Sequence, residues 1–129
     1  AYVASNASGC RYCQAHTSHV AEKRGVSVDK ISEAFEFETS SKFDDAERAA
    51  LRVALYGAIT PNQVEPSHME DLASHYSEKQ IVEIVSVISL FGFLNRWNDT
   101  MATTLEDKPK SFAATSLSAS GWEVGKHSA

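Results

Sequence analysis

The sequence predicts an all-α protein: a compact bundle of about six helices with a long buried C-terminal core helix and an extended C-terminal arm. Apolar residues recur at intervals of three and four residues along almost the whole chain, and no segment shows the strict apolar and polar alternation of a strand. The length of 129 residues, with 43% hydrophobic and 22% charged residues, suits one folded domain.

Three short helices are predicted first, over residues 1–6, 10–24 and 27–34. Glycines follow the first two, at positions 9 and 25, where the left-handed backbone that closes many helices favours glycine. Ser27 is a suitable N-cap for the third helix. Because residues 1–6 have the pattern of the last turns of a helix, we expect residues upstream of Ala1 to be missing.

Three later helices are predicted over residues 45–57, 66–75 and 77–101, after a loop at 37–43. Each begins with a polar cap residue that Glu or Gln follows three positions later: Asp44 and Glu47, Ser67 and Glu70 beside Pro66, and Ser77 and Gln80. The last helix is apolar over most of its circumference, which indicates burial on several sides. A chain of this size cannot easily surround such a helix, so we expect a homo-oligomer, whether dimer, trimer or hexamer.

The composition changes after residue 105. Residues 1–105 are expected to form the helical domain, and residues 106–129, rich in Ser, Ala, Gly and Lys around Pro109, form the arm. Phe112, Leu117 and Trp122 would anchor the arm on a neighbouring subunit; a mobile tail is the other interpretation that the composition allows.

The charge pattern excludes several partners. The formal net charge is −5, from 12 basic and 17 acidic residues, and no basic cluster offers a nucleic-acid surface. The apolar run at 81–94 is interrupted by polar residues and is shorter than the roughly 20 residues of a membrane span. Without a secretion signal, a cytoplasmic protein is expected, and without a Gly-rich phosphate loop no organic cofactor is expected.

Cys10 and Cys13 stand two residues apart at a predicted helix start. Unpaired backbone N–H groups and the helix dipole stabilise a thiolate there, and the spacing lets one cysteine attack while the other closes a disulfide. On a helix His16 lies about 60° and His19 about 120° around the axis from Cys13. His16 is therefore the better candidate for proton exchange with the pair, although a CxxC pair also occurs in inert, buried settings.

The same four residues have the composition of a zinc site. Along one helix, however, Cys10 and His19 lie about 13 Å apart, too far to share a tetrahedral ion, so no metal is expected. Covalent haem attachment needs histidine directly after the second cysteine, where this chain has Gln14.

Residues 9–17, Gly-Cys-Arg-Tyr-Cys-Gln-Ala-His-Thr, with Ala21 and Gly-Val-Ser at 25–27, resemble the carboxymuconolactone decarboxylase superfamily, specifically its alkyl hydroperoxidase D-like branch. Residues 91–100 are similar to the end of that family's core helix. The resemblance covers residues 1–105 and implies a helical oligomer that acts as a thiol-dependent peroxidase or disulfide reductase, with a hydroperoxide substrate and an external dithiol reductant.

The resemblance also implies roles for single residues. Cys13 matches the family's peroxidatic cysteine, and Cys10 matches its disulfide partner. The family's relay histidine falls four residues after the second cysteine, where this chain has Thr17, so the relay is assigned to His16. The family's relay glutamate lies about twelve residues before the first cysteine, upstream of Ala1.

Two other functions remain open from the sequence. One is a lyase like the founding decarboxylases, which lack the CxxC pair; the other is a non-catalytic, redox-sensing oligomeric module. The polar residues Asn95, Arg96, Asn98 and Asp99 predict either hydrogen bonds between helices or, for Asn95 and Asn98, the wall of a cavity. His68, His75 and His127 are expected to be exposed and to have no role.

Overall fold

The computed structural model describes residues 1–128 of the chain, and within these the fold is helical without strands. The helices are α1 (Tyr2–Ala7), α2 (Arg11–Lys23), α3 (Val28–Ser32), α4 (Asp45–Ala58), α5 (Pro66–His75), α6 (Glu78–Met101) and α7 (Asp107–Ser116), with 3₁₀ turns η1 (Ser118–Ser120) and η2 (Gly125–His127). The all-α prediction is confirmed.

Local capping accounts for most helix starts. Asp44 and Ser77 form capping boxes with Glu47 and Gln80, as the sequence predicts. The start of α5 differs, because its N-cap is Glu65, whose N–H donates to Nδ1 of His68 at 3.0 Å. Ser67 therefore lies inside the helix, since the fixed φ of the preceding proline suits the first helical position.

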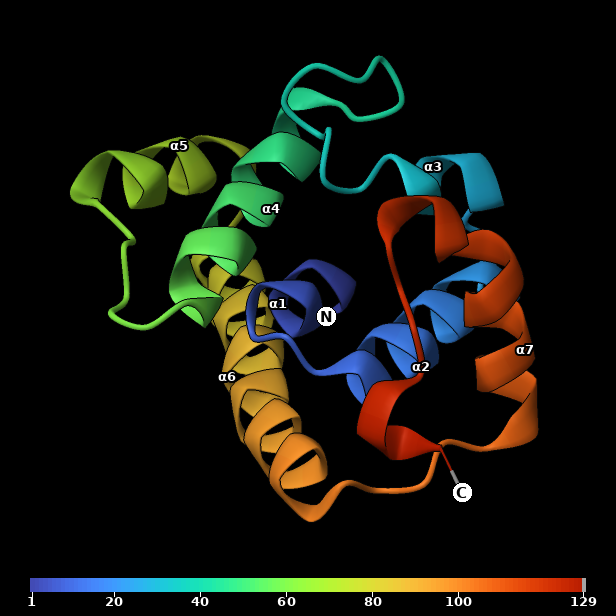
Figure 1. Ribbon diagram of the computed structural model, residues 1–129. Helices are drawn as coiled ribbons and strands as arrows, with labels where there is room; N and C mark the ends of the chain where they lie inside the picture. Colours follow the sequence, from blue (N-terminus) through green and yellow to red (C-terminus); the bar gives the residue numbers. More distant parts are fainter. Residues whose placement is uncertain (129) are drawn as a thin grey trace.

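α1 lies at the centre of the molecule and positions the other helices. Figure 1 shows α4 and α6 on one side of α1 and α2 and α7 on the other, and α1 contacts α2, α4 and α6. One apolar core joins α1, α4, α5 and α6, and a second lies between α2 and the C-terminal segment. The short link from α1 through Gly9, with φ of +76°, therefore fixes where α2 begins.

The C-terminal residues differ from the extended arm or tail that the composition suggested. They form α7 and two 3₁₀ turns that fold back onto α2 of the same chain. Leu117 and Trp122 are 1% and 7% exposed, and Nε1 of Trp122 donates to the carbonyl of Arg11 at 3.0 Å. Pro109, Ala113 and Leu117 recur at four-residue steps, so one face of α7 is buried.

α6 is less buried in the single chain than its composition predicts. Only Ile88 and Asn95 of this helix are buried, while apolar side chains on another face are exposed. Those more than half exposed are Val82, Leu90, Phe93, Trp97 and Met101. Among residues 1–128, no helix combines the length and the apolar character that crossing a membrane requires.

Candidate active site

The CxxC pair lies at the N-terminus of α2, where Cys10 is the N-cap residue. Sγ of Cys10 accepts a hydrogen bond from the backbone N–H of Cys13 at 3.2 Å. A cysteine thus occupies the position in which Ser, Thr or Asp usually satisfies the free N–H groups of a first turn. This arrangement favours negative charge on the sulfur of Cys10.

Both thiols are free and enclosed. Cys10 is 0% and Cys13 3% exposed, between the first turn of α2 and the end of α6. Nδ2 of Asn98, on α6, lies 3.8 Å from Sγ of Cys13 and donates a weak hydrogen bond to it. Of the two alternatives that the sequence left open for Asn98, this contact is the hydrogen bond between helices.

The two thiols differ in acidity. The S–H of Cys13 donates to Cys10, and this bond lowers the pKa of the Cys10 thiol below its ordinary value, although burial opposes it. The same hydrogen bond, together with burial and the charge of Cys10, raises the pKa of Cys13. Cys10 is consequently the more acidic thiol of the reduced pair, and Cys13 the less acidic one.

A carboxylate stands near both sulfurs. The charge of Asp99, next to Asn98 on α6, raises the pKa of Cys10 and of Cys13. The C-terminal segment partly compensates this charge, since Nζ of Lys126 lies 2.7 Å from Oδ2 of Asp99. The acidity of the thiols thus depends on a segment that is distant from them in sequence.

His127 belongs to the same cluster and corrects the expectation that it is exposed. It is 1% exposed, with Nδ1 2.8 Å from the carbonyl of Thr103 and Nε2 3.6 Å from Oδ1 of Asp99. Its ring lies 5.8 Å from that of Tyr12, inside the CxxC motif. No short-range sequence pattern marks His127, because its partners come from α2 and α6.

The two histidines of α2 lie against the C-terminal segment, and the ring of His16 also lies 4.5 Å from that of Tyr12. Nε2 of His16 lies 2.6 Å from Oε2 of Glu106, and the ring of His19 lies 5.3 Å from that of Phe112. Within residues 1–128 neither imidazole hydrogen-bonds a thiol. Thr17, at the family's relay position, donates its hydroxyl to the carbonyl of Cys13 at 2.7 Å.

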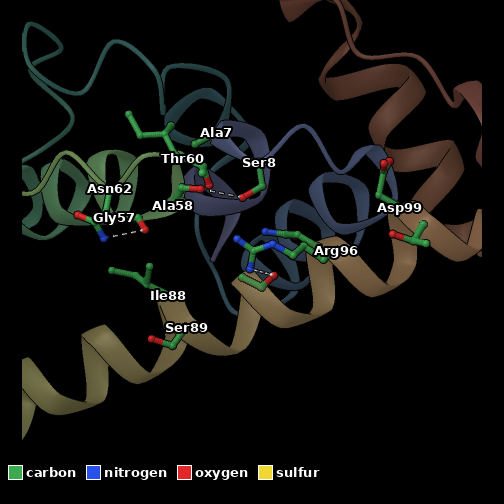
Figure 2. Close-up of a pocket in the computed structure, with 14 residues that line it drawn as sticks. Ala7, Ser8, Gly57, Ala58, Thr60, Asn62, Ile88, Ser89, Arg96 and Asp99 are labelled. Carbon is green, nitrogen blue, oxygen red and sulfur yellow. Dashed lines mark hydrogen bonds between the residues drawn. The ribbon is translucent and has the colours of Figure 1, made fainter.

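A cavity of about 840 Å³ lies along α6, beside the end of α1 (Figure 2). Ala7 and Ser8, which lead directly into Cys10, form part of its wall, as do Asn95 and Asp99. Asn95 is 2% exposed and also donates from Nδ2 to the carbonyl of Ala4 at 3.5 Å. The cavity reaches the segments that hold the cysteines, although neither cysteine lines it.

The fold and the site define an all-helical protein with a buried dithiol at a helix N-terminus. Residues 1–56 match the model of the carboxymuconolactone decarboxylase family. Residues 1–56 are therefore similar to the carboxymuconolactone decarboxylase family, and the CxxC pair within them is consistent with its alkyl hydroperoxidase D-like branch.

Three known proteins or structures show how far the similarity extends. The chain is 30% identical over 92 residues to the uncharacterized protein YnjA of Escherichia coli (strain K12), a match that covers 71% of this chain and 50% of YnjA. Apo debrominase Bmp8 has a TM-score of 0.81 and 41% identity, over 86% of this chain and 60% of Bmp8. A cysteine-to-alanine Bmp8 variant in complex with 2,3,4-tribromopyrrole has a TM-score of 0.83 and 39% identity, over 88% and 61%. The chain thus spans half to three fifths of these proteins.

Proposed function

We propose that the protein is a dithiol oxidoreductase in which Cys10 attacks a small electrophile and Cys13 closes the disulfide. The observation that carries this proposal is the N-cap geometry of Cys10, whose sulfur lies 3.2 Å from the N–H of Cys13. That contact and the thiol of Cys13 both stabilise a Cys10 thiolate, the reactive form of cysteine.

Hydroperoxides are the first candidate substrates. The Cys10 thiolate attacks the O–O bond, forming an S–O bond and releasing the alkoxide, which takes up one proton to become the alcohol. The resulting sulfenic acid reacts with the thiol of Cys13, and water leaves as the disulfide forms. An external dithiol then reduces the disulfide, so two electrons pass from the reductant to the peroxide in each cycle.

The order of the two cysteines is the reverse of the order that the family resemblance implies. The resemblance makes Cys13 the attacking residue, whereas burial and the hydrogen bond to Cys10 raise the pKa of Cys13 and keep its proton in place. Oxidation of Cys10 to the neutral sulfenic acid removes the negative charge that raises the pKa of Cys13, so Cys13 can then lose its proton and attack as the thiolate. We therefore assign attack to Cys10 and resolution to Cys13.

Reductive debromination is a second candidate, which the similarity to Bmp8 favours. In this reaction the Cys10 thiolate takes the bromine from carbon, the carbanion that leaves takes up a proton, and Cys13 displaces bromide to give the same disulfide. Both reactions consume two electrons and need the same thiol order. The geometry of the pair supports either one.

We also propose that the exposed face of α6 joins copies of the chain in a homo-oligomer. Phe93 and Trp97 lie on this face with ring centroids 6.1 Å apart, and they are 60% and 57% exposed. Exposed apolar patches of this kind mark protein interfaces. Light scattering of a Phe93→Glu variant tests the assignment, because loss of a subunit contact would lower the molar mass.

The two free thiols fit a reducing compartment, and we propose the cytoplasm as the location of the protein.

The test of the proposed function separates the two thiols. Reduced wild type, Cys10→Ser and Cys13→Ser are exposed to tert-butyl hydroperoxide or to 2,3,4-tribromopyrrole, and the products are identified by intact mass. We expect a disulfide in wild type, sulfenic acid trapped by dimedone in Cys13→Ser under peroxide, and no oxidation of Cys10→Ser. Fast sulfenic acid formation in Cys10→Ser instead would assign attack to Cys13.

The remaining outcomes distinguish the other functions. Disulfide formation in wild type without repeated consumption of dithiothreitol would support the redox-sensing module. Thiols that stay reduced with both substrates would refute the redox function, and conversion of a lactone acid by the Cys10→Ser variant would establish the lyase.

A further inference from the structure

We propose that the cavity along α6 binds a small organic anion and that the guanidinium of Arg96 is the anchor of this site. The anion site itself depends only on the cavity and on the unpaired Arg96. The inference that the anion is the substrate of the dithiol rests on the proposed function. In that case the hydroperoxide or haloarene carries an acidic group.

Arg96 is available for a ligand. Its Nη1 donates to the carbonyl of Gly92 at 3.3 Å, and among residues 1–128 no carboxylate pairs with it. Arg52, by contrast, donates to both Glu38 and Asp71 at 2.6 Å. A guanidinium has five N–H donors in a planar fork, so most donors of Arg96 are free for a planar anionic group. Figure 2 shows its side chain extending along α6 toward Ser8.

The groups that would repel an anion in this cavity are already paired. The C-terminal carbonyls of α4 carry partial negative charge, but Ser8 donates to Ala58 at 3.3 Å and Asn62 donates to Gly57 at 3.5 Å. Asp99 lies at the other end of the cavity in Figure 2 and is paired with Lys126. Arg96 is thus the uncompensated charge of this wall, in a chain whose net charge is −5.

The size and floor of the cavity indicate the class of anion. Its volume of about 840 Å³ is typical of sites for small organic molecules. Its lining is mostly polar, Ile59 and Ile88 supply an apolar part of the floor, and Gly57 and Gly92 add no side chain there. Inorganic phosphate would leave this apolar surface uncovered. An aromatic or aliphatic carboxylate satisfies both the guanidinium and the floor.

The first test uses benzoate, with benzamide as a neutral molecule of matched shape. Each is titrated into the isotope-labelled full chain, and backbone amide resonances are followed by NMR. We expect benzoate to shift the resonances of Gly57 and Gly92, and to bind at least about fivefold more tightly than benzamide. Equal affinity for the two molecules, or no shift with benzoate, would overturn the anion site.

The second test separates Arg96 from general electrostatics. Arg96→Gln should raise the Kd for benzoate about tenfold. Lys79→Gln makes the same change of charge on α6, at a side chain that is 87% exposed and outside the cavity, and should change Kd by less than about twofold. Equal weakening by both variants contradicts the assignment. Gly92→Leu, which fills the floor without changing charge, should also weaken binding.

A third measurement keeps this inference distinct from the dithiol function. A Cys10→Ser, Cys13→Ser double variant should bind benzoate with unchanged Kd, because neither cysteine lines the cavity. Wild type that binds benzoate but never oxidises its thiols refutes the proposed reaction and leaves the anion site standing. Wild type that reduces a hydroperoxide but does not bind benzoate refutes the anion site alone.

Discussion

The amide nitrogen of Asn98 lies 3.8 Å from the sulfur of Cys13, and this contact joins α6 to the first turn of α2 across 85 residues of sequence. The same nitrogen donates to the carbonyl of Leu94 at 3.0 Å, which holds the side chain in place. The amide lowers the pKa of Cys13 against burial and the charge of Cys10, which raise it. Asn98 therefore adjusts the acidity of Cys13, the thiol to which we assign the resolving step.

We expect Asn98→Leu to slow closure of the disulfide by about two- to fivefold, because loss of a weak donor makes the Cys13 thiolate less accessible. Stopped-flow measurement of sulfenic acid decay after a peroxide pulse gives this rate. Asn98→Asp removes the donor and adds negative charge, so its effect should have the same direction and be larger. An unchanged rate in both variants would show that Asn98 only fills space.

The charge of Asp99 should affect how the reactivity of the Cys10 thiol depends on pH. Its negative charge disfavours a second negative charge nearby and thus raises the pKa of Cys10. Asp99→Asn removes this effect, the pKa of Cys10 falls, and the thiolate fraction rises at every pH below the original midpoint. Alkylation by iodoacetamide in that range should be about threefold faster, with no change at pH values where Cys10 is already ionised.

Lys126 supplies the matched control of opposite sign. Lys126→Gln removes the ammonium that lies 2.7 Å from Asp99 and leaves the carboxylate charge less compensated. The pKa of Cys10 should then rise, and alkylation below the midpoint should slow. If both variants move the rate in the same direction, the effect comes from loosening the C-terminal segment and not from charge.

His16 is the site residue for which the sequence and the structure suggest different roles. The sequence assigns it to proton exchange with the thiols, but its Nε2 lies 2.6 Å from Glu106 at the start of α7. We expect His16→Gln to change the alkylation rate of Cys10 by less than about twofold and to lower the free energy of unfolding by about 0.5 kcal/mol. A large loss of peroxide reduction with intact stability would restore the relay role.

Features encoded by neighbouring residues could be predicted from the sequence. Three such features depend on a few adjacent positions, so the sequence pattern alone predicts them: the capping boxes of Asp44 and Ser77, the glycine after α1, and the helix-start position of Cys10. The dithiol itself was identified for the same reason.

The surroundings of the dithiol required the tertiary structure. Asn98 stood out because a polar residue in an apolar helix needs a partner, but nothing in the sequence identified Cys13 as that partner. Glu106 and His127 meet α2 only because α7 folds back, and the Ser- and Ala-rich composition of that segment hides its buried face. The order of thiol acidity likewise depends on which sulfur accepts the N–H, a matter of side-chain geometry.

The C-terminal segment is part of the core and packs against α2, the helix that carries the dithiol. Leu117 is 1% exposed and packs in the cluster with Ala15, Ile31 and Trp122. Leu117→Ala should lower the free energy of unfolding by about 2–4 kcal/mol in urea denaturation, since it leaves a cavity that helices cannot fully close. Val82→Ala, at a side chain 64% exposed, should cost less than about 0.5 kcal/mol.

The same variant should alter the thiols without touching them. Loosening of α7 frees the segment that carries Lys126, so the charge of Asp99 is less compensated and the pKa of Cys10 rises. Alkylation of Cys10 should therefore slow in folded Leu117→Ala below the wild-type midpoint, as it does in Lys126→Gln. If Leu117→Ala loses stability but keeps the wild-type pH profile, the segment supports the fold without adjusting the chemistry.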